Sequence, residues 1–197
     1  MLQRLPDHDV AADIWSLKYR HEGETRIADS FARVAKAVAA AEPAAVRDAW
    51  ESRFLALMND FAFLPAGRIL AGAGSAREVT LFNCFVMGGI SDSIPGIFDG
   101  LKQAAQTLQQ GGGIGHDFST LRPKGALVHG VGADASGPLS FMDVWDAMCR
   151  TIMSAGARRG AMMGTLRCDH PDIEDFIEAK RDPRRLRNFN LSVLVTD

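Results

Sequence analysis

Residues 79–118 read VTLFNCFVMGGISDSIPGIFDGLKQAAQTLQQGGGIGHDF. An apolar, β-like run opens this stretch at 79–87, and a helical run with apolar residues along one face follows at 93–109. A glycine-led run at 113–118 then predicts a second strand. Strand, helix and strand in this order predict a βαβ unit whose two strands are parallel.

The same alternation continues toward the end of the sequence. After a loop expected at 119–137, the apolar spacing from Phe141 to Ile152 predicts a helix. Strands are expected at 161–166 and 189–196, with a helix at 172–180 between them. The predicted fold class is therefore α/β with a mostly parallel sheet. Such strands are normally buried on both faces, so about four of them with a free edge indicate half of a larger sheet.

The first part of the chain predicts helices that pack on one another. A short helix is expected at 11–19, and two longer ones follow from apolar residues at helical spacing. Their stripes consist of Ile27, Phe31, Val34 and Val38, and of Val46, Trp50, Phe54, Leu57 and Phe61. We expect residues 1–63 to form an N-terminal helical region and residues 64–197 to form an α/β unit with a mostly parallel sheet.

Composition excludes several classes of protein. The 197 residues include 22 Lys and Arg against 24 Asp and Glu, a balance that argues against a broad nucleic-acid surface. No apolar run approaches the roughly 20 residues needed to cross a bilayer, and the start carries no signal-peptide pattern. Three cysteines without a CxxC motif disfavour a disulfide scaffold and a zinc ribbon. We expect a cytoplasmic protein that contacts neither membrane nor nucleic acid.

Three glycine-rich stretches could hold phosphate or ribose. They are LPAGRILAGAG at 64–74, GGGIGHDFSTLRPKG at 111–125 and SAGARRGAMMG at 154–164. Glycine lets backbone amides approach an anion closely, and arginine adds charge-assisted contacts. None of the three is a dinucleotide-binding GxGxxG or a GxxxxGK[ST] phosphate loop, so tight turns alone would explain any one of them.

Taken together and in order, these stretches resemble a known family. TLFNCFVMGGISDSIPGIFDGL, GGGIGHDFSTLRPKGA, ASGPLSFMDVWDAM and SAGARRGAMMGTLRCDHPDIEDFIEAK are similar to the catalytic (large) subunit of ribonucleotide reductases. The opening ADIWSLKYR with FLPAGRILAGAG most resembles the adenosylcobalamin-dependent class, class II. The resemblance implies a ten-stranded α/β barrel that follows an N-terminal helical region.

The resemblance also implies an activity, deoxyribonucleotide biosynthesis for DNA replication by a thiyl-radical mechanism. A cysteine radical abstracts the ribose 3′-hydrogen, and two further cysteines supply electrons as they oxidise to a disulfide. The implied cofactors are adenosylcobalamin, with binding segments mostly outside this chain, and an ATP or dNTP effector. The implied partners are a ribonucleotide substrate (diphosphate or triphosphate), a thioredoxin-like dithiol reductant, the downstream half of the reductase, and a second copy in a homodimer.

The residue roles implied by the resemblance fall into two groups. Cys84 in the FNC motif matches the first cysteine of the reducing pair, whereas a lone strand cysteine would otherwise be a small buried hydrophobe. Asn83 and Gly113 match positions that contact the substrate, although many relatives have serine in place of Asn83. The effector-binding residues implied are Asp92, Ser93, Arg122, Lys124 and Arg159.

For the effector group, simpler alternatives stay open. Asp92 matches the residue that holds the effector ribose, but it and Ser93 could also cap the following helix. Arg122 matches the phosphate-binding arginine of a first specificity loop, with Lys124 a further candidate, and a solvated loop arginine is the alternative. Arg159 corresponds to the arginine of a second loop that passes between effector and substrate base.

Other chemistry-bearing residues receive no assigned role. Cys149 and Cys168 fall in no redox motif and are interpreted as structural. Cys168, Asp169 and His170 are adjacent residues without further ligands, which disfavours a metal site. His116 could face the substrate or pack in the core.

Several family signatures do not occur in this sequence. The radical cysteine lies in an Asn-x-Cys-x-Glu signature, which these 197 residues lack, as they lack the second reducing cysteine. We therefore expect the front part of a reductase, either truncated, encoded by a fragment gene, or one chain of a split enzyme, and inactive alone. The alternative hypothesis is a non-catalytic nucleotide-binding or regulatory chain of the same fold.

Overall fold

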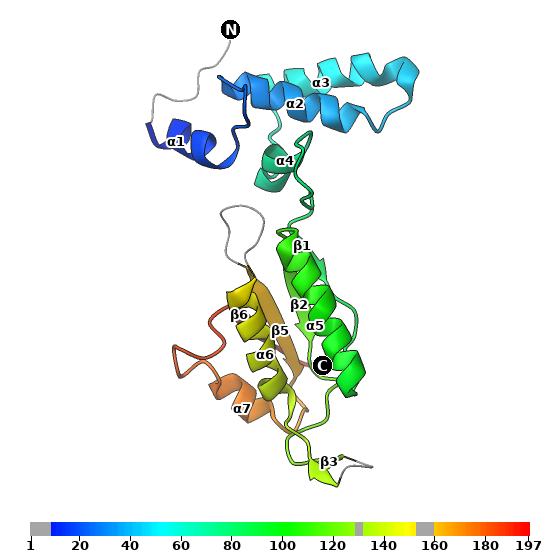
Figure 1. Cartoon of the computed structure of the whole chain (residues 1–197), viewed down its shortest axis with the longest axis vertical. Coiled ribbons are helices and arrows are strands. Elements are labelled where there is room, and N and C mark those ends of the chain that lie inside the picture. Colours follow the sequence, from blue (N-terminus) through cyan, green and yellow to red (C-terminus); the bar gives the residue numbers. More distant parts are fainter. Residues whose placement is uncertain (1–8, 129–131, 153–159) are drawn as a thin grey trace. The chain divides into compact units, whose positions relative to one another are not determined.

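The computed structural model describes residues 9–128, 132–152 and 160–197. The chain divides into two units, Met1–Phe82 and Asn83–Asp197, which are described separately (Figure 1). Within the described residues, no helix is long and apolar enough to cross a membrane.

The first unit is helical, as the periodicity predicted. Its elements are α1 (Asp9–Lys18), α2 (Ile27–Ala39), the 3₁₀ turn η1 (Ala44–Val46), α3 (Arg47–Asn59) and α4 (Gly67–Gly72). Phe31, Val34 and Ala35 of α2 form a core with Met58 of α3 and with Ala73. The three helices expected in this part of the sequence are confirmed.

Helix α4 lies inside the glycine-rich stretch that the sequence analysis assigned to the α/β unit. The guanidinium of Arg33 on α2 donates to the main-chain oxygens of Leu70 and Ala73, which satisfies carbonyls at the end of α4. This contact comes from a residue more than 30 positions away, so the local glycine content does not predict it. The helical unit consequently extends to Phe82.

The second unit is built on a four-stranded parallel sheet. Strands β1 (Cys84–Val86), β2 (Gly113–Asp117), β5 (Met162–Arg167) and β6 (Phe189–Leu194) follow one another in the order β1-β2-β5-β6. Helices α5 (Ile94–Gln109), α6 (Pro138–Thr151) and α7 (Ile173–Glu178) connect successive strands. The predicted α/β class, with a helical region followed by a parallel sheet, is confirmed.

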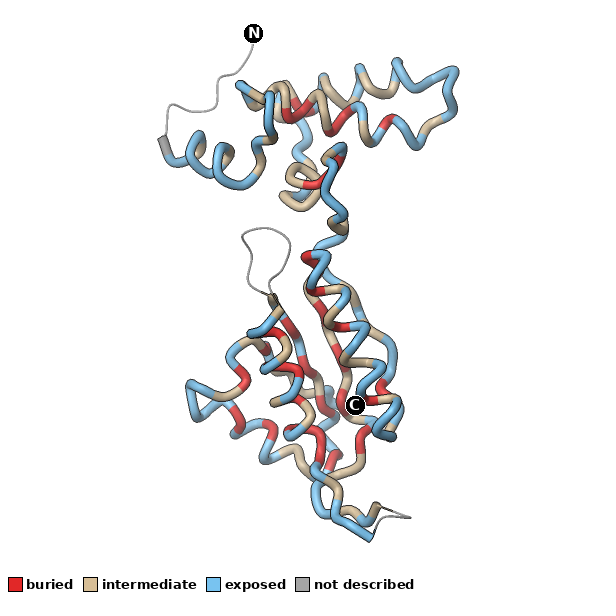
Figure 2. Tube along the Cα trace, in the orientation of Figure 1, coloured by how far each residue is buried: buried red, intermediate tan, exposed pale blue. Residues whose placement is uncertain are grey.

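Helices cover one face of this sheet. Ile114 and Met162, which alternate with more exposed residues along β2 and β5, pack against Leu108 of α5 and Trp145 of α6 in a single core. Figure 2 shows the buried positions of α5 and α6 along the sides that face the strands. On the opposite face Val86 is 98% exposed, so the described helices of this unit cover the sheet on one side only.

Two local predictions about this unit were wrong. The strand expected at 79–87 is limited to Cys84–Val86, the three residues that pair with the first three residues of β2. The loop expected at 119–137 contains a small antiparallel hairpin of β3 (Leu127–Val128) and β4 (Ala133–Asp134). Such short strands carry too few residues for a two-residue periodicity to be detected.

Candidate functional site

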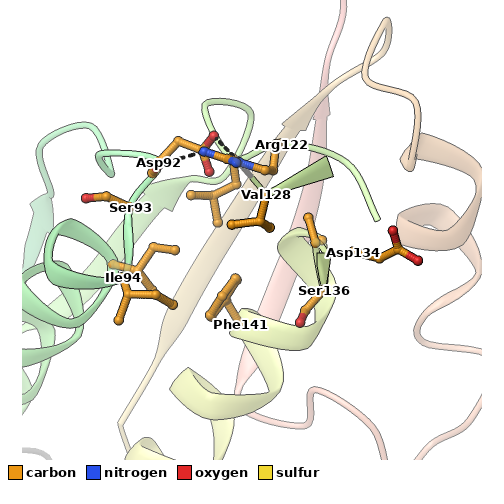
Figure 3. Close-up of a pocket in the computed structure, with 12 residues that line it drawn as sticks. Asp92, Ser93, Ile94, Arg122, Val128, Asp134, Ser136 and Phe141 are labelled. Atoms are coloured by element: carbon orange, nitrogen blue, oxygen red, sulfur yellow. Dashed lines mark hydrogen bonds and ion pairs between the residues drawn. The ribbon is translucent and has the colours of Figure 1, made fainter. Parts of the chain in front are cut away.

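A pocket of about 150 Å³ opens beside the first turn of α5 (Figure 3). One wall comes from Asp92, Ser93 and Ile94, and the opposite wall comes from the hairpin and from the start of α6. The other lining residues are Ile97, Leu121, Arg122, Val128, Asp134, Ala135, Ser136, Gly137 and Phe141. Three of the five residues predicted to bind an effector, Asp92, Ser93 and Arg122, therefore meet in one pocket.

An ion pair crosses the mouth of this pocket. Nε of Arg122 donates to Oδ2 of Asp92 at 2.7 Å, and Nη2 of Arg122 donates to the main-chain oxygen of Asp92 at 3.2 Å. The two side chains keep 34% and 33% of their surface exposed. The pair is therefore accessible to a solute, and the predicted effector-binding role of Arg122 stays a prediction.

The local sequence explains why Asp92 stands at this position. Ser93 is the N-cap of α5, and its hydroxyl accepts a hydrogen bond from the amide of Gly96 at 3.2 Å. The capping alternative is thus confirmed for Ser93, and the carboxylate of Asp92 is left to face Arg122. The hydroxyl of Thr120 donates to the main-chain oxygen of Ile90 at 2.7 Å and joins the two segments that carry the pair.

The hairpin is fixed to the rest of the unit at its base. The carboxylate of Asp172 accepts a hydrogen bond from the backbone amide of Lys124 at 2.9 Å. Gly137 has a positive φ of 78°, and a Cβ at this position would meet Asp172 and Lys124 at 2.8 and 2.9 Å. Lys124 itself does not line the pocket, and Arg159 lies outside the described residues.

The residues predicted to contact substrate lie together at the amino ends of β1 and β2. Cys84 is exposed and pairs in register with Gly113, whose amide donates to the main-chain oxygen of Asn83 at 2.8 Å. A Cβ on Gly113 would lie 3.4 Å from both Sγ of Cys84 and the main-chain oxygen of Ala161. In this chain the Cys84 thiol is therefore exposed beside a residue that has no side chain, and its predicted redox role stays a prediction.

The two other cysteines differ from each other. Cys149 is buried on α6, and burial together with the nearby Asp146 carboxylate raises the pKa of its thiol. Cys168 is exposed after β5, and its interpretation as a residue without a redox role stays a prediction. Its neighbour Asp169 forms an ion pair with Arg167, whose guanidinium lies 2.6 Å away.

His116 belongs to the core and not to the open face of the sheet. It is 4% exposed, and its ring packs edge-on against Trp145 with centroids 5.7 Å apart. Within the described part of the chain, neither ring nitrogen has a hydrogen-bond partner, and burial lowers the imidazole pKa from 6.5 to about 4. The neutral, packed form is therefore the one present at neutral pH.

Sequence reasoning missed the hairpin side of the pocket. Val128 and Asp134 reach it only because β3 and β4 pair, and Phe141 reaches it from α6. The available signal in the sequence was a glycine, Gly132, next to two short β-like runs. In the structure its φ is positive, 66°, a value that favours glycine. Taken alone, that signal does not show where the hairpin packs.

Comparison with known proteins matches both units. Residues 8–78 match the model of the ribonucleotide reductase all-alpha domain, and residues 82–197 match that of the ribonucleotide reductase barrel domain. The chain belongs to the ribonucleotide reductase family. The resemblance inferred from the motifs is thereby confirmed.

The relatives of this chain include reductases described as vitamin B12-dependent and others without that description. It is 42% identical over 186 residues to a vitamin B12-dependent ribonucleoside-diphosphate reductase of Mycobacterium tuberculosis, covering 90% of this chain and 26% of the relative. A relative with the same description in Thermoplasma acidophilum is 44% identical over 147 residues, or 74% of this chain and 19% of its own length.

A ribonucleoside-diphosphate reductase subunit alpha of Chlamydia muridarum is more distant. It is 28% identical over 152 residues, which are 75% of this chain and 14% of the relative. The chain thus spans about a quarter, or less, of the length of the curated relatives it matches.

Proposed function

We propose that this chain is the N-terminal portion of the catalytic subunit of a cobalamin-dependent ribonucleotide reductase. The family match of both units and the printed names of the relatives from Mycobacterium tuberculosis and Thermoplasma acidophilum support this assignment. In the complete enzyme, the substrate would be a ribonucleotide and the product the corresponding deoxyribonucleotide.

The observation that carries this proposal is the exposed thiol of Cys84 next to Gly113 on the uncovered face of the sheet. Loss of a ribose 2′-hydroxyl as water, with hydrogen in its place, requires two electrons. Two thiols supply them by forming one disulfide. Cys84 would be one of these thiols, and Asn83 and Gly113 would hold the ribose beside it.

The pocket between α5 and the hairpin would hold the effector, ATP or a dNTP. Arg122 supplies the cation of the described lining, and guanidinium groups bind phosphate oxygens through charge-assisted hydrogen bonds. The carboxylate of Asp92 suits ribose hydroxyls. Phe141 and Val128 add apolar surface for a base. Lys124 and Arg159 would assist from the flanking segments.

The described residues do not form a cobalamin site. A corrin with its nucleotide tail is several times larger than the nucleotide proposed for the pocket of about 150 Å³. No cluster of three or more potential metal ligands occurs among the described residues. The cofactor, the radical cysteine and the second reducing cysteine would therefore be bound or supplied by other segments of the complete enzyme.

The test is a single turnover of the complete, pre-reduced reductase without added dithiol. We expect Cys84 to become protected from alkylation in proportion to the deoxynucleotide formed, as measured by peptide mass spectrometry. Cys168, which is also exposed, is the matched control and should stay open to alkylation. Cys84→Ser should abolish multiple turnover with a dithiol, whereas Cys168→Ser should retain it. Substrate-dependent oxidation of Cys168, or full turnover by Cys84→Ser, would overturn the assignment.

A further inference from the structure

The two polar groups that the effector would use are already bound to each other. Arg122 contacts Asp92 through both its carboxylate and its main-chain oxygen, at 2.7 and 3.2 Å. A phosphate that binds the same edge of the guanidinium must replace the carboxylate. A ribose hydroxyl that binds Asp92 must likewise compete with Arg122.

The charge of the lining adds to this competition. Among the described residues of the pocket, Arg122 is the single cation, while Asp92 and Asp134 are anions. The described lining therefore carries one negative charge in excess, and its one cation is already bound to a carboxylate when a polyphosphate approaches. The pair is about one-third exposed, so water screens it and its exchange is not prohibitively costly.

We propose that Asp92 acts as an internal competitor of phosphate for Arg122, so that the pocket opens only to a ligand carrying both phosphate and ribose. Binding exchanges the carboxylate for phosphate oxygens on the guanidinium, and the released carboxylate accepts hydrogen bonds from ribose hydroxyls. A polyphosphate without a sugar breaks the pair but leaves Asp92 uncompensated next to its own negative charge. A nucleoside without phosphate has nothing to offer Arg122.

This exchange rests on the proposed function, because it requires Arg122 to bind effector phosphate. It goes beyond that function because Asp92 would also disfavour the binding of a polyphosphate that carries no sugar. The probe is inorganic tripolyphosphate, compared with dTTP and ATP, titrated calorimetrically into the complete reductase at fixed salt. Circular dichroism melts of every variant establish that the fold is retained.

Three single variants and one double variant separate the possible causes. Asp92→Asn removes the paired carboxylate with little change in volume. Asp134→Asn removes a carboxylate from the same lining and is the matched control, because no ion pair joins Asp134 to Arg122 among the described residues. Arg122→Gln removes the cation, and the double variant Asp92→Asn/Arg122→Gln completes a double-mutant cycle.

We expect Asp92→Asn to bind tripolyphosphate about three- to tenfold more tightly than the wild type, since the guanidinium of Arg122 would no longer be paired with a carboxylate and could donate to phosphate oxygens. Asp134→Asn should change this affinity by less than about twofold, because screening weakens a carboxylate that does not contact the phosphate. The gain from Asp92→Asn should disappear in the Arg122→Gln background. The preference for dTTP and ATP over tripolyphosphate should shrink in Asp92→Asn.

Each other outcome overturns a defined part of the scheme. If Asp92→Asn and Asp134→Asn raised the affinity for tripolyphosphate equally, the cause would be the net charge of the lining and not competition for Arg122. If Asp92→Asn bound tripolyphosphate more weakly than the wild type, Asp92 would hold Arg122 in position for phosphate and would not compete with it. In both cases Arg122-dependent binding of dTTP or ATP would leave the effector site standing. Absence of nucleotide binding, or binding that ignores Arg122→Gln, would overturn the effector site itself and the exchange with it.

Discussion

The two units of the chain each contain an arginine–carboxylate pair of nearly the same length, with different surroundings. In the helical unit Nε of Arg33 lies 2.6 Å from Oε1 of Glu24, and in the sheet unit Nε of Arg122 lies 2.7 Å from Oδ2 of Asp92. The first pair is 14% and 9% exposed, whereas the second is 34% and 33% exposed.

The remaining hydrogen-bond partners differ as well. Arg33 also donates to main-chain oxygens of Tyr19, Leu70 and Ala73, so its guanidinium is surrounded by protein acceptors. Arg122 has one further acceptor, the main-chain oxygen of Asp92, among the described residues. Distance alone therefore does not separate a structural ion pair from one that a ligand can exchange; burial and the number of acceptors do.

The largest expected effect is on the less exposed pair. Arg33→Met should lower the free energy of unfolding of the helical unit by about 2–4 kcal/mol, because the partly buried Glu24 would lose its cation and main-chain oxygens would lose their donor. Arg26→Met, which removes the more exposed partner of Asp29, is the matched control and should have little effect. Hydrogen exchange of the α2 and α4 amides measures the change in the free energy of unfolding for both variants. A loss below about 1 kcal/mol for Arg33→Met would remove the contrast between the two pairs.

His116 sharpens the comparison, since it is a buried ionisable group without a partner among the described residues. Its pKa is about 4 when folded and about 6.5 when exposed, so the unfolded state binds more protons between these values. The contribution of neutral His116 to the free energy of unfolding is therefore fully present above pH 6.5 and is lost as the pH falls toward 4. Between pH 7 and pH 5 the expected loss from this group is about 2 kcal/mol.

The measurement uses urea unfolding followed by Trp145 fluorescence, with Trp15 and Trp50 replaced by Phe. His116→Leu should remove about that much of the pH dependence. His170→Leu is the control, because the His170 ring is hydrogen-bonded to Leu121 and to the amide of Asp172. A His116→Leu variant with the same pH profile as the parent would show that burial does not determine the protonation of His116.

The smallest expected effect concerns the exposed pair. Arg122→Gln should lower the stability of the sheet unit by less than about 1 kcal/mol, because solvent and salt screen a pair of this exposure. Arg185→Gln, which removes a similarly exposed pair with Asp143, should give a comparable value. Hydrogen exchange of the α5 and α6 amides checks both. A loss of several kcal/mol for Arg122→Gln would make its pair structural, like that of Arg33.

Part of the candidate site followed from the sequence. Asp92 and Arg122 lie 30 residues apart and were both predicted from family motifs to bind the effector. Their pairing was not predicted, because it depends on the contact between Thr120 and Ile90 that joins two loops. The third glycine-rich loop, with Arg159, lies outside the described residues, so its predicted role stays a prediction.

The sequence by itself determined the alternation of strands and helices, because apolar periodicity and caps such as Ser93 act within a few residues. It also determined the family, because several motifs occur in the same order and spacing. Only the tertiary structure decided that residues 67–72 form a helix, that a hairpin closes the pocket, and that His116 is buried without a partner among the described residues. These features depend on contacts between segments distant in the chain, whose free energies outweigh local propensities that differ by less than about 1 kcal/mol per residue.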